Sequence, residues 1–302
     1  MAFVPVLHSV SYAGVWPGQA CLSLEQFLAK AAELGFPAVM LMAKRPHLSV
    51  LDYDRKSCER LRRLMEDKGI ECRVIAGYNN FSADLEHGDM PNREIQIQHV
   101  TELARMASDL GAGIVRIFTS YESPVAGYST LWQTTVDSIR ECARRAAKYQ
   151  VTIGVQNHHD LAAHYESQFD LIRAVGEPNC RAIFDAWAPA LQGTDLGKAA
   201  QTMASITCHT TAADYQRKPR FRYHPKLVNY EKQIDWVQAV PMGEGFIDYT
   251  GFLQALRKGG YRGGVGYEMC SPLAGGGTIE NLDCYARRFL EFLNSIESGT
   301  TG

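Results

Sequence analysis

Four polar residues stand directly after short apolar runs, and their side chains could bind a metal ion or move a proton. Gln156 follows "VTIGV", Asp185 follows "CRAIF", His209 follows "SITC" and Glu268 follows "GVGY". Oxygen and imidazole donors without a thiolate suit a divalent ion such as Mn2+, Mg2+, Co2+ or Zn2+. Taken singly, each has an ordinary explanation, since an Asp after a strand is often a helix N-cap and a histidine often packs in a core. The elements that carry the four residues decide whether they meet.

The chain repeats one pattern, in which an amphipathic helical stretch and a glycine or turn precede a short apolar run. In "SLEQFLAKAAELGFPAVMLM", Ser23 and Gln26 have the spacing of a capping box, Gly35 is a helix stop, and residues 39–42 form an expected strand. An opening strand is expected near residues 4–10 and a last helix near residues 279–295. Short apolar strands separated by helices indicate a parallel sheet covered on its faces.

Eight such strand–helix units within 302 residues favour a closed (β/α)8 TIM barrel over an open doubly wound sheet. No G-x-G-x-x-G motif or P-loop follows the first strand. Without a break in composition, we expect one domain over residues 1–296 and a disordered tail over residues 297–302. The C-terminal strand ends of such a barrel share one mouth, so the four polar residues are expected to converge there.

Three longer motifs around these residues resemble a known family. They are "AIFDAW" with Asp185, "ITCHTTAAD" with His209, and "VPMGEGFIDYTGFLQALRKGGYRGGVGYEM" with Glu268. Over nearly the whole barrel, the chain resembles the xylose isomerase-like TIM barrels, which include sugar (phosphate) isomerases, epimerases and dehydratases. The resemblance implies one divalent metal held by Glu, Asp, His and Glu from strands 5 to 8. Asp185, His209 and Glu268 match that set, whereas Gln156 stands in the place of the strand-5 glutamate.

The glutamine changes the chemistry that the resemblance implies. The resemblance implies that the two glutamates also serve as acid and base on opposite faces of the substrate. The carbonyl oxygen of Gln156 could still bind a metal, but an amide cannot accept a proton, so this acid–base pair is incomplete. His158 follows closely, and strand alternation would place it on the same side as Gln156. With an unperturbed pKa of about 6.5, it suits proton transfer near neutrality. We therefore assign Glu268 as metal ligand and base, and His158 as second acid or base; the alternative for His158 is a hydrogen bond to substrate hydroxyls.

Three further residues are candidates for binding a substrate. Arg116, within "AGIVRIF", could hold a phosphate or carboxylate, or form a salt bridge at the barrel rim. His159 adjoins His158 and is a second candidate. Trp187, just after Asp185, could form an apolar wall for a sugar ring or pack between helices.

The segment that follows His209 is far longer than an ordinary connection between a strand and a helix. We expect a long loop after strand 7, rich in basic and aromatic residues, and Arg220 within it is a candidate to contact substrate. Such loops serve as lids or as contacts in a homo-oligomer. Binding of nucleic acid is disfavoured, because the chain has 31 Lys and Arg against 33 Asp and Glu and so is not basic overall.

The remaining composition predicts a cytoplasmic protein that is not inserted in a membrane. Eight scattered cysteines form no C-x-x-C pair and indicate reduced thiols. The N-terminus lacks a basic signal-like segment, and no window reaches the length of a membrane span.

Together these features predict an enzyme that binds a divalent metal and acts on a small carbohydrate, a sugar, keto sugar or cyclitol. The expected step is removal of a proton next to a carbonyl, which gives a metal-bound enediolate. Reprotonation at the adjacent carbon would make the protein an isomerase or epimerase, and loss of a neighbouring substituent would make it a lyase, such as a dehydratase or a deglycosidase of 3-keto glycosides. A barrel that binds carbohydrate without turning it over is the third alternative.

Overall fold

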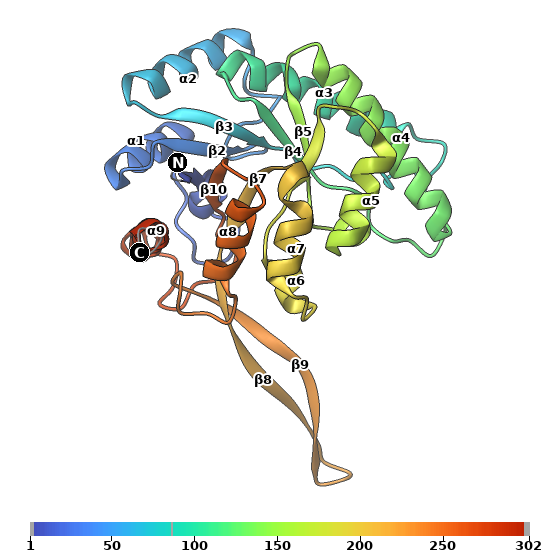
Figure 1. The fold of residues 1–302 in the computed structure, drawn as a ribbon, viewed down its shortest axis with the longest axis vertical. Helices are drawn as coiled ribbons and strands as arrows, with labels where there is room; N and C mark the ends of the chain where they lie inside the picture. The colour runs from blue at the N-terminus through green and yellow to red at the C-terminus, as the bar shows by residue number, and fades with distance from the viewer. Residues whose placement is uncertain (1–2, 86, 299–302) are drawn as a thin grey trace.

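A computed structural model, which describes residues 3–85 and 87–298, shows a closed barrel of parallel strands (Figure 1). Around the barrel the order is β1, β10, β7, β6, β5, β4, β3, β2, so that neighbours in sequence are neighbours in space apart from the inserted β8 and β9. This arrangement confirms the predicted (β/α)8 TIM barrel. The barrel strands are β1 (Val4–His8), β2 (Ala38–Met42), β3 (Glu71–Ala76), β4 (Ile114–Ile117), β5 (Thr152–Gln156), β6 (Cys180–Ile183), β7 (Thr207–Ala212) and β10 (Gly264–Tyr267).

Helices surround the barrel between successive strands (Figure 1). At the start of the first helix, Ser23 accepts a hydrogen bond from the backbone N–H of Gln26 while the Gln26 side chain accepts one from the Ser23 N–H. Gly35 ends that helix with φ 84°, so the predicted cap and stop are both confirmed. The helices are α1 (Leu24–Leu34), α2 (Arg55–Asp67), α3 (Asn92–Leu110), α4 (Tyr128–Ala147), α5 (Tyr165–Val175), α6 (Trp187–Leu191), α7 (Leu196–Met203), α8 (Tyr249–Lys258) and α9 (Ile279–Ser298).

The strands bury one set of side chains inside the barrel and the alternate set against the helices. In β2, Met40 belongs to a small interior cluster with Val6, whereas Val39 and Leu41 belong to the large core beneath the helices. This alternation of sides along each strand also decides which residues near a strand end point into the barrel mouth.

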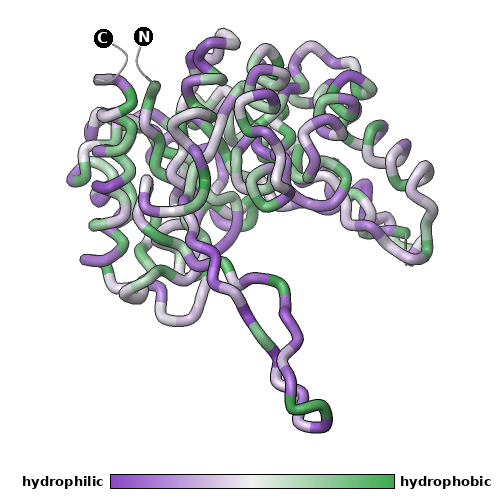
Figure 2. Tube along the Cα trace, turned by 60° about the horizontal axis from the view of Figure 1, so that its bottom comes forward, coloured by the Kyte–Doolittle hydropathy of each residue, from purple (hydrophilic) through white to green (hydrophobic). Residues whose placement is uncertain are grey.

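The long segment after β7 is an ordered hairpin and not the loop expected from sequence. Strands β8 (Asp214–His224) and β9 (Asn229–Val240) pair antiparallel with each other and with no barrel strand. The hairpin projects from the barrel and stands clear of it over most of its length (Figures 1 and 2).

The C-terminal helix extends slightly beyond its expected end. Glu297 and Ser298, which sequence assigns to the tail, are the last residues of α9. Residues 299–302 of that expected tail lie outside the described residues. Within the described part of the chain, no helix has the length and apolar character needed to cross a membrane.

A glycine after β3 lets this strand approach the backbone of β4, and we expect Gly77→Ala to destabilise the barrel. The added Cβ would lie 2.8 Å from the backbone oxygen of Arg116 and 2.9 Å from a methyl carbon of Leu103. Because a backbone atom cannot move aside cheaply, the cost should be about 1–3 kcal/mol, lowering the thermal unfolding midpoint by several degrees. Gly113→Ala is the matched control, since its Cβ would meet no atom within 4 Å. Equal midpoints for the two variants would contradict this account.

Candidate active site

A small cavity lies at the C-terminal mouth of the barrel, where the sequence places its candidate residues. The residues that line it come from the ends of four strands and from the segments that follow them. They include Gln156, His158, Asp185, Trp187, Thr211 and Glu268. The structure therefore brings together three of the four strand-end residues singled out from sequence.

Gln156 lies at the centre of the hydrogen bonds in this mouth. Its amide Nε2 is 3.1 Å from Oδ2 of Asp185 and 3.2 Å from Oε2 of Glu268, and it also faces Oγ1 of Thr211 at 3.4 Å. Its Oε1 accepts a hydrogen bond of 2.9 Å from Nη1 of Arg116. The glutamine thus links two carboxylates on one side to a guanidinium on the other.

Arg116 dictates which way the Gln156 amide faces. A guanidinium has five N–H donors and no acceptor, so the amide oxygen must point to Arg116 and the amide nitrogen to the carboxylates. The arginine side chain is 1% exposed and packs between aromatic rings, with Cζ 4.1 Å from the ring centre of Phe118 and 4.7 Å from that of Tyr78. The opposite amide orientation would set donor against donor at Arg116.

Glu268 is held as a carboxylate by positive charge. Burial raises its pKa, but the neighbouring His8 and Arg116 and the hydrogen bond from Gln156 outweigh burial and lower the pKa below its usual value, His8 contributing only in its protonated form. Nε2 of His8 is 3.6 Å from Oε1 of Glu268. Burial lowers the pKa of His8 to about 3, so His8 is neutral near pH 7 and Arg116 is the permanent cation next to Glu268.

The pKa of Asp185 is shifted in the direction opposite to that of Glu268. Burial, with a contribution from the charge of Glu268, raises the pKa of Asp185 to about 6, although hydrogen bonds from Gln156 and the Trp187 N–H partly offset the rise. Near neutrality a fraction of Asp185 is therefore protonated while Glu268 is ionised. Two carboxyl groups whose pKa values are pushed apart can serve as an acid and a base.

His209 lies deeper in the barrel than the other three strand-end candidates. Its ring packs against glycines of β10, because a Cβ added at Gly266 would lie 3.0 Å from Nε2 of His209 and one at Gly264 would lie 3.2 Å from its Cε1. His209 pairs in register with Ile183, two residues before Asp185. Side chains two residues apart on a strand share a face, so Thr211, two residues after His209, is the β7 residue at the level of Asp185.

The donors present do not fit the divalent ion that the resemblance implies. The amide oxygen of Gln156 is taken by Arg116, its N–H groups face the carboxylates, and a hydroxyl of Thr211 stands where a histidine was expected. Across residues 3–85 and 87–298, no three or more His, Cys, Asp or Glu side chains gather in a way that could hold a metal. The mouth retains two carboxylates with an amide and a guanidinium beside them.

His158 lines the cavity in a defined tautomer. Its Nδ1 accepts a hydrogen bond of 3.0 Å from the backbone N–H of His159, so the ring proton resides on Nε2. Burial lowers the pKa of His158, with a smaller effect of Arg116 in the same direction, so the ring is neutral near pH 7. In this state His158 can donate a hydrogen bond to a ligand oxygen, while its Nδ1 lone pair is occupied.

His159 turns away from the cavity. Its backbone φ is 55°, which departs from the extended conformation of a strand. The ring packs against Phe118, with ring centres 4.2 Å apart, and its Nε2 forms a hydrogen bond with the hydroxyl of Tyr121. Burial and the neighbouring His158 lower the pKa of His159 to about 4. Strand alternation could not anticipate this turn, because it depends on aromatic residues from the segment after β4.

Trp187 and Arg220, the other two substrate-binding candidates, have different surroundings. Trp187 lines the cavity and stacks on Tyr215, with ring centres 5.2 Å apart, so its role as an apolar wall for a sugar ring stays a prediction. Arg220 pairs in register with Gln233 on the projecting hairpin and is not among the residues that line the cavity. Arg116 lies beneath the lining and acts on the mouth through Gln156.

Sequence reasoning missed Thr211, Tyr215 and Cys270, which all line the cavity. Thr211 follows His209 by two residues and Cys270 follows Glu268 by two residues, so the alternation of side chains along a strand could have identified both. Tyr215 lies just inside the segment expected to be a loop.

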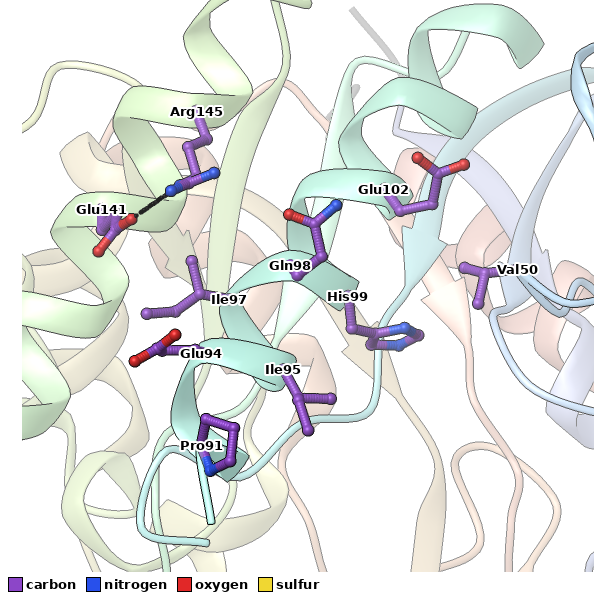
Figure 3. Close-up of a pocket in the computed structure, with 10 residues that line it drawn as sticks. All are labelled: Val50, Pro91, Glu94, Ile95, Ile97, Gln98, His99, Glu102, Glu141 and Arg145. Atoms are coloured by element: carbon purple, nitrogen blue, oxygen red, sulfur yellow. Dashed lines mark hydrogen bonds and ion pairs between the residues drawn. The ribbon is translucent and has the colours of Figure 1, made fainter. Parts of the chain in front are cut away.

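A larger hollow, of about 910 Å³, lies on the helical outside of the barrel along α3 (Figure 3). It is lined by residues of α3 and α4 with Val50 and Pro91, so it is separate from the strand ends. Its lining combines carboxylates, His99 and Arg145 with apolar side chains, and contains none of the acid–base candidates of the mouth.

Comparisons with known proteins agree with this fold. A family model described as xylose isomerase-like TIM barrel matches residues 28–295. The chain is 23% identical over 256 residues to the rhizopine catabolism protein MocC of Rhizobium meliloti, covering 80% of this chain and 72% of that protein. D-psicose 3-epimerase from Clostridium cellulolyticum H10 superposes with a TM-score of 0.74 and 16% identity, over 97% of this chain and 99% of that one. The probable 3-DHS dehydratase AsbF from Bacillus anthracis superposes with a TM-score of 0.71 and 19% identity, over 96% and 99%.

Proposed function

Because the chain belongs to the xylose isomerase-like TIM barrel family, we propose that it is an enzyme that removes a proton next to the carbonyl of a sugar, keto sugar or cyclitol. One observation carries the proposal. At the barrel mouth, an ionised Glu268 and a partly protonated Asp185 both contact the amide of Gln156, which sets a base beside an acid. The structural relatives named as an epimerase and a dehydratase support this class of substrate.

In the proposed reaction, Glu268 takes the proton from the carbon next to the carbonyl. The C–H electron pair forms the new C=C bond, and the carbonyl oxygen takes the proton of Asp185, which gives an enediol. Glu268 then returns its proton to the former carbonyl carbon while Asp185 recovers a proton from the neighbouring hydroxyl. The net result is exchange of carbonyl and hydroxyl between adjacent carbons, which is an isomerisation.

This geometry favours an isomerase over a two-base epimerase. Inversion at one carbon calls for a second base on the opposite face of the substrate. Gln156 cannot accept a proton, and the Nδ1 lone pair of His158 is engaged by the backbone. We therefore assign His158 to donate a hydrogen bond from Nε2, and not to abstract a proton.

A lyase is the second candidate, and the same tautomer of His158 favours it. Elimination needs one base and one donor, which Glu268 and the Nε2–H of His158 would supply. After Glu268 takes the proton, the electron pair expels a hydroxyl or glycosyl oxygen from the next carbon, and that oxygen leaves with a proton donated by His158 or Asp185. The eight cysteines are free thiols, which supports a reducing, cytoplasmic setting for either activity.

Incubation of a panel of keto sugars and keto cyclitols in D2O tests the proposal and separates its branches. We expect deuterium to enter a product of otherwise unchanged composition if the protein is an isomerase. Release of water or an aglycone would identify a lyase. Ligand binding without deuterium entry or release, by both the wild type and Glu268→Gln, would identify a non-catalytic barrel and overturn the proposal.

A further inference from the structure

We infer that Gln156, oriented by Arg116, takes the place of a divalent ion in this barrel, so that the site works with a guanidinium as its built-in cation. The inference deepens the proposed function and depends on it for the reaction, but not for the prediction about metal binding. A cation that bridges the carboxylates of Asp185 and Glu268 would have to occupy the space between them.

The amide nitrogen of Gln156 already occupies that bridging position. It lies within 3.2 Å of one oxygen of each carboxylate, which is hydrogen-bonding distance. A metal ion placed there would face N–H groups, because Arg116 holds the amide oxygen on the far side. The amide can turn its oxygen inward only if the bond to Arg116 breaks.

Arg116 gives the barrel mouth a cation that belongs to the protein itself. Arg116 supplies one permanent positive charge, and Glu268 supplies one negative charge near neutrality. The amide of Gln156 carries no charge, so the buried guanidinium of Arg116 supplies the positive charge that a metal ion would have brought.

Two further features of its surroundings support a functional role for the charge of Arg116. Among the residues described, its Nε and Nη2 atoms lack a hydrogen bond of ordinary geometry and have only the Tyr78 hydroxyl nearby, although the residue is 1% exposed. Burying a cation with unsatisfied donors is costly, and such groups call for a functional reason. The rings of Phe118 and Tyr78 supply part of the compensation.

The decisive experiment measures metal binding directly, without relying on activity. We expect purified wild-type protein to contain well under one equivalent of divalent metal, and its unfolding temperature to be unchanged by Mn2+, Co2+ or Zn2+. The matched gain-of-function variant is Gln156→Glu with Thr211→His. A carboxylate can serve Arg116 with one oxygen and a metal with the other, and a histidine at Thr211 lies at the right level of β7. This variant should bind about one ion and unfold about 5 °C higher with metal.

Two results would overturn the inference. One is a stoichiometric ion in the wild type that Asp185→Asn removes. The other is a metal-dependent rise in the unfolding temperature of the wild type that equals that of the double variant. If the wild type binds no metal and also shows no deuterium exchange with any substrate, the proposed reaction fails while the inference about the cation stands.

A second inference concerns the β8–β9 hairpin, whose aromatic face has no partner within the described chain. Phe221, Tyr223 and Tyr230 lie on one face, because Tyr223 pairs with Tyr230 across the ladder and Phe221 is two residues from Tyr223. Their side chains are 61%, 48% and 67% exposed. A two-stranded hairpin is marginally stable in water by itself, and clustered exposed aromatics mark interaction surfaces.

The charge of the hairpin indicates what covers that face. Residues 214–240 contain six Lys and Arg against three Asp and Glu, whereas the whole chain has 31 against 33, so the remainder of the chain is acidic. Two basic hairpins would repel each other, which disfavours hairpin-to-hairpin pairing. A second copy of the chain offers an acidic surface instead.

The hollow along α3 has the complementary chemistry. Figure 3 shows Glu94, Glu102 and Glu141 beside apolar Ile95 and Ile97. Glu141 is paired with Arg145, which also lines the hollow, and Glu102 is paired with Arg105, which leaves Glu94 as the carboxylate available to a partner. Ile95, between Glu94 and Glu102 along α3, is 55% exposed. We propose that the aromatic and basic hairpin of one copy docks into this hollow on another copy.

Sedimentation equilibrium of the full chain tests the docking. We expect the wild type to be an oligomer and Lys232→Glu to shift it toward monomer, because Lys232 pairs with Phe221 and so lies on the aromatic face. Adding Glu94→Lys should restore the oligomer, because both charges are then exchanged. The matched control, Lys56→Glu, makes the same charge change on the exposed face of α2 and should have no effect. A monomeric wild type, or an oligomer that the hairpin variant leaves intact, would overturn the proposal.

Discussion

Glu268→Gln is expected to lower kcat/KM by about 10³-fold, the range in which removal of a general base falls. The amide retains the shape of the carboxylate but cannot accept a proton. Gln156 does not replace it as a base, and the Nδ1 of His158 is engaged by the backbone. Loss of the Glu268 carboxylate should therefore stop proton abstraction while the site keeps its shape.

The measurement is deuterium exchange into a keto-sugar substrate, with ligand affinity measured in parallel. We expect exchange to be lost while affinity changes little, because the hydrogen-bonding shape of the site is retained. Glu244→Gln is the matched control, since Glu244 is exposed and its ion pair is with Arg288. Exchange near the wild-type rate in Glu268→Gln would refute the assignment of the base.

Arg116→Met should reduce kcat/KM by about 10²-fold or more while the unfolding midpoint stays the same or rises. Activity falls because the cation next to Glu268 is lost and Gln156 is free to turn its amide. Stability is maintained because methionine fills a similar space between Phe118 and Tyr78 without the cost of a buried charge. Replacing a residue with a purely structural role would lower the unfolding midpoint, so reduced kcat/KM with an unchanged or higher midpoint indicates a role in the reaction.

The same substitution should also move the pH profile in a defined direction. Glu268 acts as a base in its ionised form, so activity rises as pH passes through its pKa. The charge of Arg116 lowers that pKa, hence its removal raises the pKa and shifts the acidic limb of kcat/KM to higher pH. Arg181→Met, on the strand next to β5, is the control and should leave the profile in place. A profile unchanged in Arg116→Met would mean that the arginine has a structural role alone.

The repeating units of the barrel were readable from sequence because their signals are local. The capping box of Ser23 and Gln26 spans four residues, and Gly35 ends its helix through its own backbone freedom. The ends of β5, β6 and β10 were readable for the same reason, since an apolar run stops at a polar residue. The family resemblance then rested on motifs at those ends and on the helices between them.

The hairpin was not readable in this way. Its strands alternate basic and aromatic residues without an apolar face toward the barrel, so the pattern resembled a loop. The strands are held by pairs across the turn, such as Phe221 with Lys232 and Tyr223 with Tyr230, and neither strand shows the alternating apolar pattern that predicts a strand from sequence.

Sequence by itself determined the barrel and the convergence of Gln156, Asp185 and Glu268 at one mouth, because each strand end is set by its own neighbours. Tertiary structure alone decided that Thr211 reaches this mouth while His209 packs beneath it against the glycines of β10. It also decided that the amide nitrogen of Gln156 faces the carboxylates, since Arg116 lies 40 residues away and Glu268 lies 112 residues away. Orientation of a side chain depends on the donors and acceptors that the fold brings around it, and no local pattern records those partners.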